Sequence, residues 1–369
     1  MMIPITLKVF FAALLVLVES TPTKDCTITR FSQVQTVINS CTDILVSNLT
    51  VPAGIVLELD LQNGTTMTFE GTTLFEHTPW SGPLIRVKGV DVTLQGAPGS
   101  VFDGQGPLYW DHLGDKGPKK PQFMKVEVFG KSVFRWIKLL NCPHHCVYIG
   151  KSDGLTIANW TIDNSAGDLH NFSGHNTDGF DVSAANNLII ENTAVLNQDD
   201  CIAIRYGSNI LVRNMYCSGG HGLSLSVGFN KTSYPENVVE NVLIENSRLV
   251  RSANGIHVKT HTDGYLGLIR NVTYRNIKMQ GVTNYGINVQ QDYRDGGSTG
   301  TPKANVLIDG LNMINITGSA HKGSKAMGVY IICGDNSCTN WNWGGISIDG
   351  ARRNDSCNFS PTGYECHDV

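Results

Sequence analysis

The sequence predicts an all-β, single-domain, right-handed parallel β-helix, and three observations lead to this fold class. A short motif of Asn or Gly, an apolar residue, any residue and a second apolar residue recurs with spacings of 33, 22, 32, 30 and 34 residues. A second alternating apolar segment lies between successive copies of the motif. Glycine is abundant, with 39 of 369 residues, and long runs of Ala, Glu, Lys and Leu are missing, which disfavours a helical bundle. Two short strands per repeat are typical of a solenoid coil.

The first element is an apolar segment at residues 9–18, which follows Lys8 and ends shortly before Ser20. It is shorter than the roughly 20 apolar residues that a membrane-spanning helix needs. We therefore expect residues 1–20 to be a secretory signal peptide and residues 21–369 to be the mature β-helix domain. No second apolar run follows, so the sequence predicts a secreted, extracellular protein that has no membrane partner.

The two strands of each repeat follow in order along the chain. The first strand is expected at 154–157, 187–190, 209–212, 241–244, 271–274 and 305–308, and the second at 146–149, 179–182, 201–204, 222–225, 255–258 and 286–289. Alternate side chains of a strand face opposite ways. The predicted core-facing residues of the second strand are Phe180, Val182, Ile202, Ile204, Leu223, Leu225, Ile256 and Val258. The predicted outward columns are Asp181, Ala203, Ser224, His257 and Asn288, and then Ser183, Arg205, Ser226, Lys259 and Gln290. The tail, with Trp341 and Trp343, is expected to cap the open end of the solenoid.

The ten cysteines suit an oxidising compartment, because their number is even. Their order along the chain suggests five local disulfides: Cys26 with Cys41, Cys142 with Cys146, Cys201 with Cys217, Cys333 with Cys338, and Cys357 with Cys366. Zinc-ligand spacing does not recur, so we expect no metal and no cofactor. Nine sequons are candidate glycosylation sites, at Asn48, Asn63, Asn159, Asn171, Asn230, Asn271, Asn315, Asn354 and Asn358.

Net charge limits the classes of partner. The chain has 28 basic and 32 acidic residues and a formal charge of −4, which excludes broad electrostatic attraction to nucleic acid.

Carboxylates and an imidazole lie immediately before three successive second strands. They are Asp178, then Asp199 and Asp200, then His221, and we expect them at a bend because inward-facing charges would be costly. Carboxylates close together allow one acid and one base to coexist, which is the pair that inverting glycoside hydrolysis needs. The alternative is that they are turn aspartates or Ca²⁺ ligands between coils, although turns do not require such residues on consecutive coils.

These residues resemble the polygalacturonases of glycoside hydrolase family 28. The similarity lies in NTDGFD at 176–181, NQDDC at 197–201, GGHGLS at 219–224 and QQDY at 290–293, and it extends over nearly the whole mature chain. The resemblance implies an inverting hydrolase that cuts α-1,4 bonds between galacturonates in polygalacturonate or pectin and requires no metal.

The resemblance also implies individual roles. Asp199 is the expected general acid, Asp178 and Asp200 position and deprotonate the attacking water, and His221 orients the cluster. Lys259 and Tyr293 match substrate-binding residues of the family, and His257 stands where the family has Arg. Because His titrates near neutrality, we expect any activity to be limited to mildly acidic pH, where protonated His257 could pair with a carboxylate.

Other functions stay open at this level. The substitution at His257 suggests, as alternatives, a hydrolase of a modified or rhamnose-containing pectin, or a catalytically weak homologue that binds pectin or a pectinase inhibitor. A Ca²⁺-dependent pectate lyase is disfavoured because the motifs match the hydrolases. We expect an endo-acting enzyme, since no appended domain or large insertion closes the groove. We also expect a monomer, with plant pectinase-inhibitor proteins as possible partners.

Overall fold

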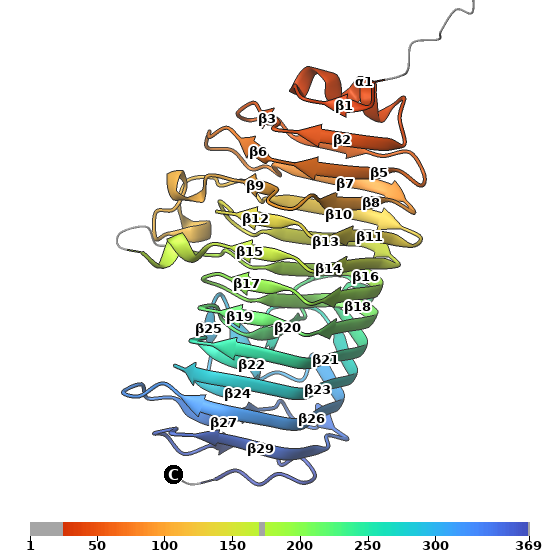
Figure 1. Cartoon of the computed structure of the whole chain (residues 1–369). Helices are drawn as coiled ribbons and strands as arrows, with labels where there is room; N and C mark the ends of the chain where they lie inside the picture. The colour runs from red at the N-terminus through yellow and green to blue at the C-terminus, as the bar shows by residue number, and fades with distance from the viewer. Residues whose placement is uncertain (1–24, 170–173, 368–369) are drawn as a thin grey trace, which may run out of the picture.

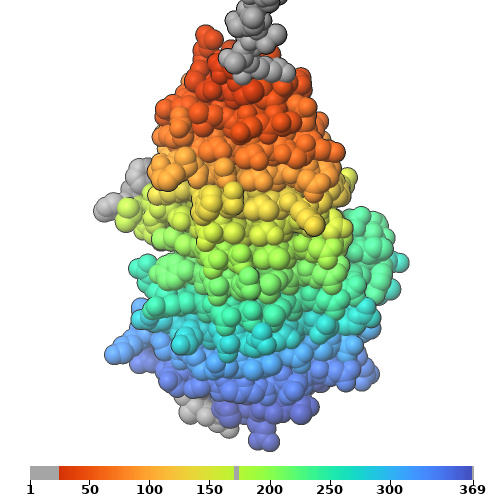
Figure 2. All heavy atoms as spheres, turned by 45° about the vertical axis from the view of Figure 1, so that its right-hand side comes forward, coloured from red at the N-terminus to blue at the C-terminus, as the bar shows by residue number. Residues whose placement is uncertain are grey.

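The computed structural model describes residues 25–169 and 174–367 and confirms the right-handed parallel β-helix (Figure 1). The strands of the described residues join in one continuous sheet that winds along the helix axis. Neighbouring strands pair in parallel except for a short antiparallel contact between β24 (Tyr285–Arg294) and β25 (Gly297–Ser298). Successive coils stack so regularly that the sequence colours form bands along the axis in Figure 2.

The strands form three faces. The first face contains β4 (Leu57–Asp60), β7 (Ile85–Val90), β10 (Met124–Phe129), β13 (Val147–Asp153), β16 (Phe180–Glu191), β18 (Ile202–Arg213), β20 (Leu223–Val227), β22 (Asn254–His261), β24, β27 (Met327–Ile332) and β30 (Ser356–Cys357). The second contains β1 (Thr27–Ile28), β2 (Asp43–Ser47), β5 (Thr66–Glu70), β8 (Thr93–Gly96), β11 (Ser132–Arg135), β14 (Leu155–Ala158), the later halves of β16 and β18, β21 (Val238–Val250), β23 (Gly267–Val282), β26 (Val306–Ala320) and β28 (Cys338–Thr339). The third contains β3 (Thr50–Val51), β6 (Thr72–Phe75), β9 (Val101–Asp103), β12 (Lys138–Leu140), β15 (Thr161–Asp163), β17 (Ala194–Leu196), β19 (Tyr216–Ser218), the ends of β21, β23 and β26, and β29 (Trp343–Asp349).

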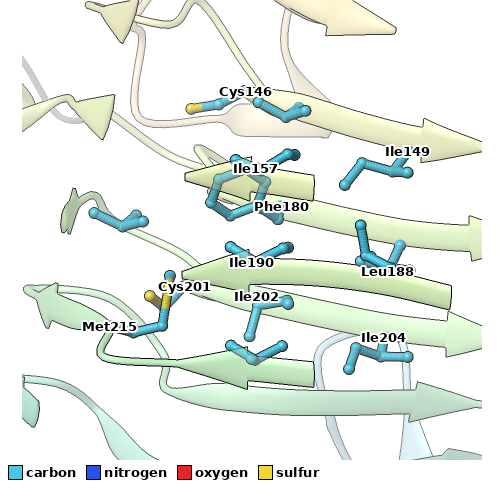
Figure 3. Packing of buried hydrophobic residues seen from close by; sticks show 14 of the residues in the cluster. Cys146, Ile149, Ile157, Phe180, Leu188, Ile190, Cys201, Ile202, Ile204 and Met215 are labelled. Atoms are coloured by element: carbon cyan, nitrogen blue, oxygen red, sulfur yellow. The ribbon is translucent and has the colours of Figure 1, made fainter. Parts of the chain in front are cut away.

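The core lies inside the coil and consists of apolar residues in register. Phe180 pairs with Ile202, which pairs with Leu223, and the same column continues to Ile256 and Ile287 on the next coils. Figure 3 shows several of these side chains packed between the faces. All eight residues that the sequence predicts to face the core are fully buried. Each such side chain contributes about 1.5–3 kcal/mol to folding when it leaves water.

Asparagines form the bends that lead into the second face. Asn187, Asn209, Asn241 and Asn271 all have φ between 50° and 56°, in the left-handed region that Asn tolerates better than most residues. Their side-chain amides also bond from coil to coil, as in the 2.8 Å bond from Asn271 Nδ2 to Asn241 Oδ1. The leading Asn of the repeat therefore both turns the chain and links neighbouring coils.

Short helices and aromatic residues cover the two ends and the loops. At the N-terminal end, η1 (Phe31–Gln33) and α1 (Val34–Ile38) bury Val34, Val37 and Ile38 against the first coil. At the C-terminal end the buried rings of Trp341 and Trp343 stack with 5.8 Å between centroids, as the expected cap. The remaining helices are η2 (Gly106–Leu108), η3 (Gly114–Lys116), η4 (Ser165–Asp168) and η5 (Pro235–Asn237).

The disulfide prediction is right for four pairs and wrong for one. Cys26–Cys41, Cys201–Cys217, Cys333–Cys338 and Cys357–Cys366 are bonded, whereas Cys142 and Cys146 are free and buried. The side chain of Asn164 is bonded to both segments, from Nδ2 to Cys146 Sγ (3.1 Å) and from the Cys142 amide to Oδ1 (2.7 Å). Burial and the neighbouring Cys142 raise the pKa of the Cys146 thiol well above its usual value, and this disfavours the thiolate that oxidation needs.

A thiol titration tests whether Cys142 and Cys146 are free thiols. Because both free sulfurs are buried in the core, the folded protein is expected to react with no thiol reagent, and unfolding is expected to expose two thiols per chain. Ellman's reagent with and without guanidinium measures both numbers. If no thiol appears after unfolding, Cys142 and Cys146 form the fifth disulfide.

The remaining sequence predictions concern the surface and the terminus. Residues 1–20 and Asn171 lie outside the described residues. Of the other sequons, Asn230 is half-buried and the rest are exposed: Asn48, Asn63, Asn159, Asn271, Asn315, Asn354 and Asn358. Within the described ranges, every helix is too short or too polar to traverse a bilayer.

Candidate active site

The predicted acidic cluster lies where three neighbouring strands of the first face begin. Asp178 precedes β16, Asp199 and Asp200 precede β18, and His221 precedes β20. Since β16, β18 and β20 pair in parallel and in register, their starts meet at one edge of the face. All four side chains therefore gather at the bend, as predicted.

A buried asparagine that sequence reasoning missed shapes this bend. Asn197 is fully buried, and its Nδ2 atom lies 2.9 Å from each of the backbone carbonyls of Thr177, Asp199 and Asp200. These contacts join two consecutive coils directly beneath the carboxylates. The sequence offers one indication of this role: Asn197 lies two residues before the pair Asp199 and Asp200.

Asp199 and His221 form an ion pair. His221 Nδ1 lies 3.0 Å from Asp199 Oδ1, which also accepts the Asp200 amide at 2.8 Å. Burial disfavours the charge of Asp199, but the hydrogen bond and charge of His221 outweigh it and hold the pKa of this carboxyl below its usual value. Burial likewise opposes protonation of His221, yet the bond to Asp199 raises the pKa of His221 to about 9.

Asp200 pairs with the predicted substrate-binding lysine. Lys259 Nζ on β22 lies 2.7 Å from Asp200 Oδ2, and Ser224 donates to Asp200 Oδ1 at 2.7 Å. Lys259 is buried, which disfavours its charge, but Asp200 raises its pKa above the usual value. The ammonium group also lies 5.2 Å from the ring centre of Tyr293 on β24, so the two predicted substrate-binding residues are neighbours.

Asp178 is the carboxyl group of the cluster that favours its neutral form. Burial raises the pKa of Asp178 well above its usual value, and the charge of nearby Asp199 raises it further. Its closest cationic neighbour is His145, whose Nε2 atom lies 3.7 Å from Asp178 Oδ1. The cluster thus retains one proton where several carboxyl groups crowd together.

A second group of charges, which sequence reasoning did not assign to the site, lies behind Asp178. His145 Nδ1 is 2.5 Å from Asp181 Oδ2, and Arg205 donates to Asp181 Oδ1 at 3.0 Å. Burial disfavours the charge of Asp181, but Arg205 and His145 lower its pKa to about 2. Despite burial, Asp178 and Asp181 raise the pKa of His145 to about 10. The contact between neighbouring coils places His145 beside the acids.

The outward columns are confirmed in part. The pairings run from Asp181 to Ala203, Ser224, His257 and Asn288, as predicted. In the next column Ser226, Lys259 and Gln290 pair as predicted, but Ser183 pairs with Tyr206 instead of Arg205. A register shift after Val182 causes this difference, and Arg205 reaches back to Asp181 instead.

His257 differs most from its prediction. It is not an exposed strand residue but a buried one, with 7% of its surface accessible. Burial and the neighbouring Lys259 charge lower the pKa of His257 well below its usual value, so a protonated His257 at mildly acidic pH is wrong for the unliganded site. Asn254 Nδ2 lies 3.3 Å from Nδ1, which makes Nδ1 the acceptor and leaves the proton on Nε2. Nε2 forms no well-aligned hydrogen bond with any described residue, although Gln290 lies beside it.

A second histidine, His261, lies next to Tyr293 near Lys259. His261 packs edge-on against Tyr293 with 5.2 Å between ring centres, and its Nε2 atom lies 2.9 Å from Ser226 Oγ. Burial and Lys259 lower the pKa of His261 to about 4. His257 and His261 are therefore neutral neighbours of Lys259, and Lys259 is the charged group among these three side chains.

Each ionised acid of the site has a cationic partner. Asp199 pairs with His221, Asp200 with Lys259, and Asp181 with His145 and Arg205. Oxygen and nitrogen atoms of Asp199, Asp200 and His221 lie within 4.8 Å of one another, as do those of His145, Asp178 and Asp181. Because the acids already have cationic partners, this donor set is suited to acid and base chemistry rather than to holding a cation.

The two protonated histidines predict a loss of stability in alkali. A group whose pKa is raised by folding stabilises the protein below its unfolded pKa and loses that contribution as the pH rises through its folded pKa. For His221 and His145 this window runs from the ordinary histidine pKa of 6.5 up to folded-state pKa values of about 9 and about 10. We expect the melting temperature to fall by roughly 5 °C across this window.

Calorimetry at a series of pH values measures this dependence. His145→Gln is expected to be less stable near neutrality and to show a flatter alkaline slope. His321→Gln is a matched control, because His321 is exposed and far from the cluster in the chain. An unchanged slope in His145→Gln would contradict the pairing of His145 with these acids.

The family model for glycosyl hydrolases of family 28 matches residues 41–366. The chain belongs to glycosyl hydrolase family 28. This match covers the whole acidic cluster and the strands that carry it, and it makes the protein a glycosidase. Similar proteins include a polygalacturonase from Phaedon cochleariae, 49% identical over 98% of this chain and 99% of the relative. Endopolygalacturonase I from Aspergillus niger is 42% identical over 92% of this chain and 91% of the relative.

Among solved structures, endopolygalacturonase I from Stereum purpureum, complexed with two galacturonates, is 32% identical to this chain. Its fold matches with a TM-score of 0.79 over 92% of this chain and 98% of that chain.

Proposed function

We propose that this family 28 enzyme is a secreted, endo-acting, inverting hydrolase of the α-1,4 bonds in polygalacturonate and pectin. The observation that carries the proposal is the gathering of Asp178, Asp199, Asp200 and His221 at one edge of the first face, with one proton retained by Asp178 and another by His221. Similarity to endopolygalacturonases favours this substrate over a modified or rhamnose-containing pectin. The complete acid cluster favours turnover over a role in binding pectin alone.

Asp199 serves as the general acid in this proposal. His221 Nδ1 lies 3.0 Å from Asp199 Oδ1, so His221 can transfer its proton to this carboxylate. Protonated Asp199 then faces the glycosidic oxygen of the bound substrate. Because protonated Asp199 no longer repels it, Asp178 can then release its proton to solvent and ionise, and His221 regains its proton from solvent after the reaction. Asp199 gives its proton to the leaving oxygen as the bond to the anomeric carbon breaks. Water attacks that carbon from the other face and gives a proton to Asp178 or Asp200.

Lys259, His257 and Tyr293 hold the substrate. Lys259 Nζ uses one contact for Asp200 and keeps further N–H donors for a galacturonate carboxylate. Neutral His257 offers its Nε2–H as an uncharged donor beside Lys259. Tyr293 contributes an aromatic surface next to both side chains.

The pH dependence of His257 variants follows from this arrangement. Because His257 is already neutral, His257→Gln is expected to keep the shape of the pH profile of kcat/KM between about pH 5 and pH 7. The value of kcat/KM is expected to fall by about tenfold at each pH, since one hydrogen bond to a charged group changes. A profile that becomes flat in the variant would instead show that His257 titrates in this range.

The remaining parts of the proposal concern the setting of the enzyme. We propose secretion because of the N-terminal apolar segment and the four disulfides. We also propose that the enzyme acts as a monomer, with plant pectinase-inhibitor proteins as candidate partners.

One assay tests the function. The purified protein is incubated with de-esterified polygalacturonate, and viscosity and reducing ends are followed together, with Asp199→Asn as the inactive control. An endo-acting hydrolase lowers viscosity before many ends appear, without forming the unsaturated product of a lyase. Ends that appear without loss of viscosity would contradict endo action. If a panel of substrates shows activity on a modified pectin alone, that polymer is the substrate instead of polygalacturonate.

A further inference from the structure

A groove lies away from the acid cluster, where the second face turns into the third. Its volume is about 840 Å³, within the range of roughly 300–1,000 Å³ that is typical of small-molecule sites. The residues that matter for its chemistry are Gln95, Ser100, Trp136, Lys138, Asn159 and Thr161. They belong to coils before β16, whereas the catalytic carboxylates begin strands of the first face.

An ordered aromatic surface lines this groove. Trp136 is 51% exposed, and Arg135 lies over one face of its ring at 4.3 Å. Arg135 Nε is held by Gln95 Oε1 at 3.0 Å, and Gln95 Nε2 donates to Thr68 Oγ1 at 2.9 Å. One ring face is therefore covered by a fixed guanidinium, and the exposed fraction of the side chain belongs mainly to the other face. An open indole face packs well against the apolar face of a sugar ring.

A buried hydroxyl group without a partner lies in the same groove. Ser100 has 6% of its surface accessible, and its Oγ atom forms no hydrogen bond with the described residues. Buried polar atoms in folded proteins nearly always have a partner, so the Ser100 hydroxyl requires either an ordered water or a polar group of a ligand. A sugar hydroxyl or acetamide group can supply that partner.

Asn159 at the rim of the groove can carry such a ligand covalently. It begins the sequon Asn159-Trp160-Thr161, and its exposed side-chain amide forms no hydrogen bond among the residues described here. The amides of Asn271 and Asn315, by contrast, bond to the asparagine of the preceding coil. The side-chain amide of Asn159 is therefore free to receive a glycan, and it lies at the rim of a groove that suits a ring with polar substituents.

We propose that Asn159 carries an N-linked glycan whose first sugars lie in this groove against Trp136 and Ser100. In the modification, Asn159 Nδ2 loses one proton and forms a bond to the anomeric carbon of N-acetylglucosamine. The bond from that carbon to the pyrophosphate of a lipid-linked oligosaccharide donor breaks, and the lipid pyrophosphate leaves. The modification rests on the proposed secretion but not on the proposed hydrolysis.

The charges of the groove favour this neutral glycan over a chain of galacturonates. Arg135 is committed to Gln95 and to the ring of Trp136, and Lys138 lies 3.9 Å from Asp163 Oδ2. A polyuronate would require free cations, whereas N-acetylglucosamine requires an apolar surface and hydrogen-bond partners.

Peptide mapping tests the modification. The full chain is expressed in a eukaryotic secretory host, and the mass of the peptide that contains Asn159 is measured before and after glycosidase treatment. We expect this peptide to carry hexosamine. Thr161→Val and Asn159→Gln are each expected to remove it, whereas Thr161→Ser keeps the sequon and is expected to keep the glycan. An unmodified Asn159 in a protein that is glycosylated at other sequons overturns the proposal.

Fluorescence quenching tests the position of the sugars. Of the six tryptophans, Trp136 is the one that is exposed, so acrylamide reports mainly on its ring. Quenching of the exposed component is expected to be about twofold stronger in Asn159→Gln, because the open ring face loses its sugar. In the Trp136→Ala background, Asn159→Gln is expected to change nothing.

Equal quenching with and without the glycan overturns the proposal. So does protection of Trp136 in Asn159→Gln by added oligogalacturonate, which would assign the groove to the polymer. Mass and fluorescence are independent of turnover, so a failed activity assay leaves this test intact.

Discussion

Asp199→Asn is expected to reduce hydrolysis of polygalacturonate by about 10²- to 10⁴-fold, the usual contribution of a positioned general acid. The amide has nearly the same shape as the carboxyl group but cannot deliver a proton to the leaving oxygen. It also removes the charge that raises the pKa of His221. We therefore expect kcat to fall much more than KM changes, with reducing-end release as the measurement.

The control for this variant is Asp153→Asn, which changes an exposed aspartate at the end of β13 on the same face, where it accepts a hydrogen bond from Asn187. It is expected to retain wild-type activity. Circular dichroism of both variants should match that of the wild type, since neither substitution changes an apolar core residue. If folded Asp199→Asn keeps more than about a tenth of the activity, another group delivers the proton.

Lys259→Met is expected to be the most destabilising single change in the site. It leaves the Asp200 carboxylate buried without the ammonium group that lies 2.7 Å from it. Loss of one partner of a buried ion pair costs about 3–5 kcal/mol, because the remaining charge is uncompensated. We also expect kcat/KM to fall by about 10²-fold or more, because the cation that faces the substrate carboxylate is gone. Denaturant unfolding and steady-state kinetics measure the two effects.

A second substitution separates stability from activity. Asp200→Asn in the Lys259→Met background removes the uncompensated charge and is expected to restore most of the lost stability. Activity is expected to stay lost, since both the carboxylate and the cation are missing. Lys278→Met, on the exposed surface of β23, is a matched control for the loss of a lysine. Wild-type stability in Lys259→Met would contradict the buried ion pair.

Much of the fold could be predicted because the bends and strands of the repeat depend on interactions between residues that are close in the sequence. Asparagine at the start of four repeat strands turns the chain through a left-handed conformation, and alternation assigns the core side of each strand. Asp178, Asp199, Asp200 and His221 could be placed together for the same reason, since each precedes an equivalent strand on consecutive coils.

The partners of those acids could not be predicted to the same degree. His145 and Asp181 are 36 residues apart, and their contact depends on the stacking of one coil on the next. Arg205 does not lie in its predicted column because the strand register shifts after Val182. The alternation of residues in a sequence does not reveal where such a bulge occurs. The pairing of Cys142 with Cys146 was wrong because proximity alone does not make a disulfide: both residues are buried as free thiols, and Cys146 Sγ accepts a hydrogen bond from Asn164.

The sequence by itself determined the coil, its bends and the residues at the edge of the first face. These features depend on the conformational preference of single residues and on the alternation of neighbouring ones. Only the tertiary structure decided which groups hold protons. His257 alternates outward like any strand residue, yet it is buried beside Lys259 and stays neutral, whereas His221 beside Asp199 stays charged. Protonation depends on burial and on charges a few ångströms away in space, and residues distant in the sequence supply both.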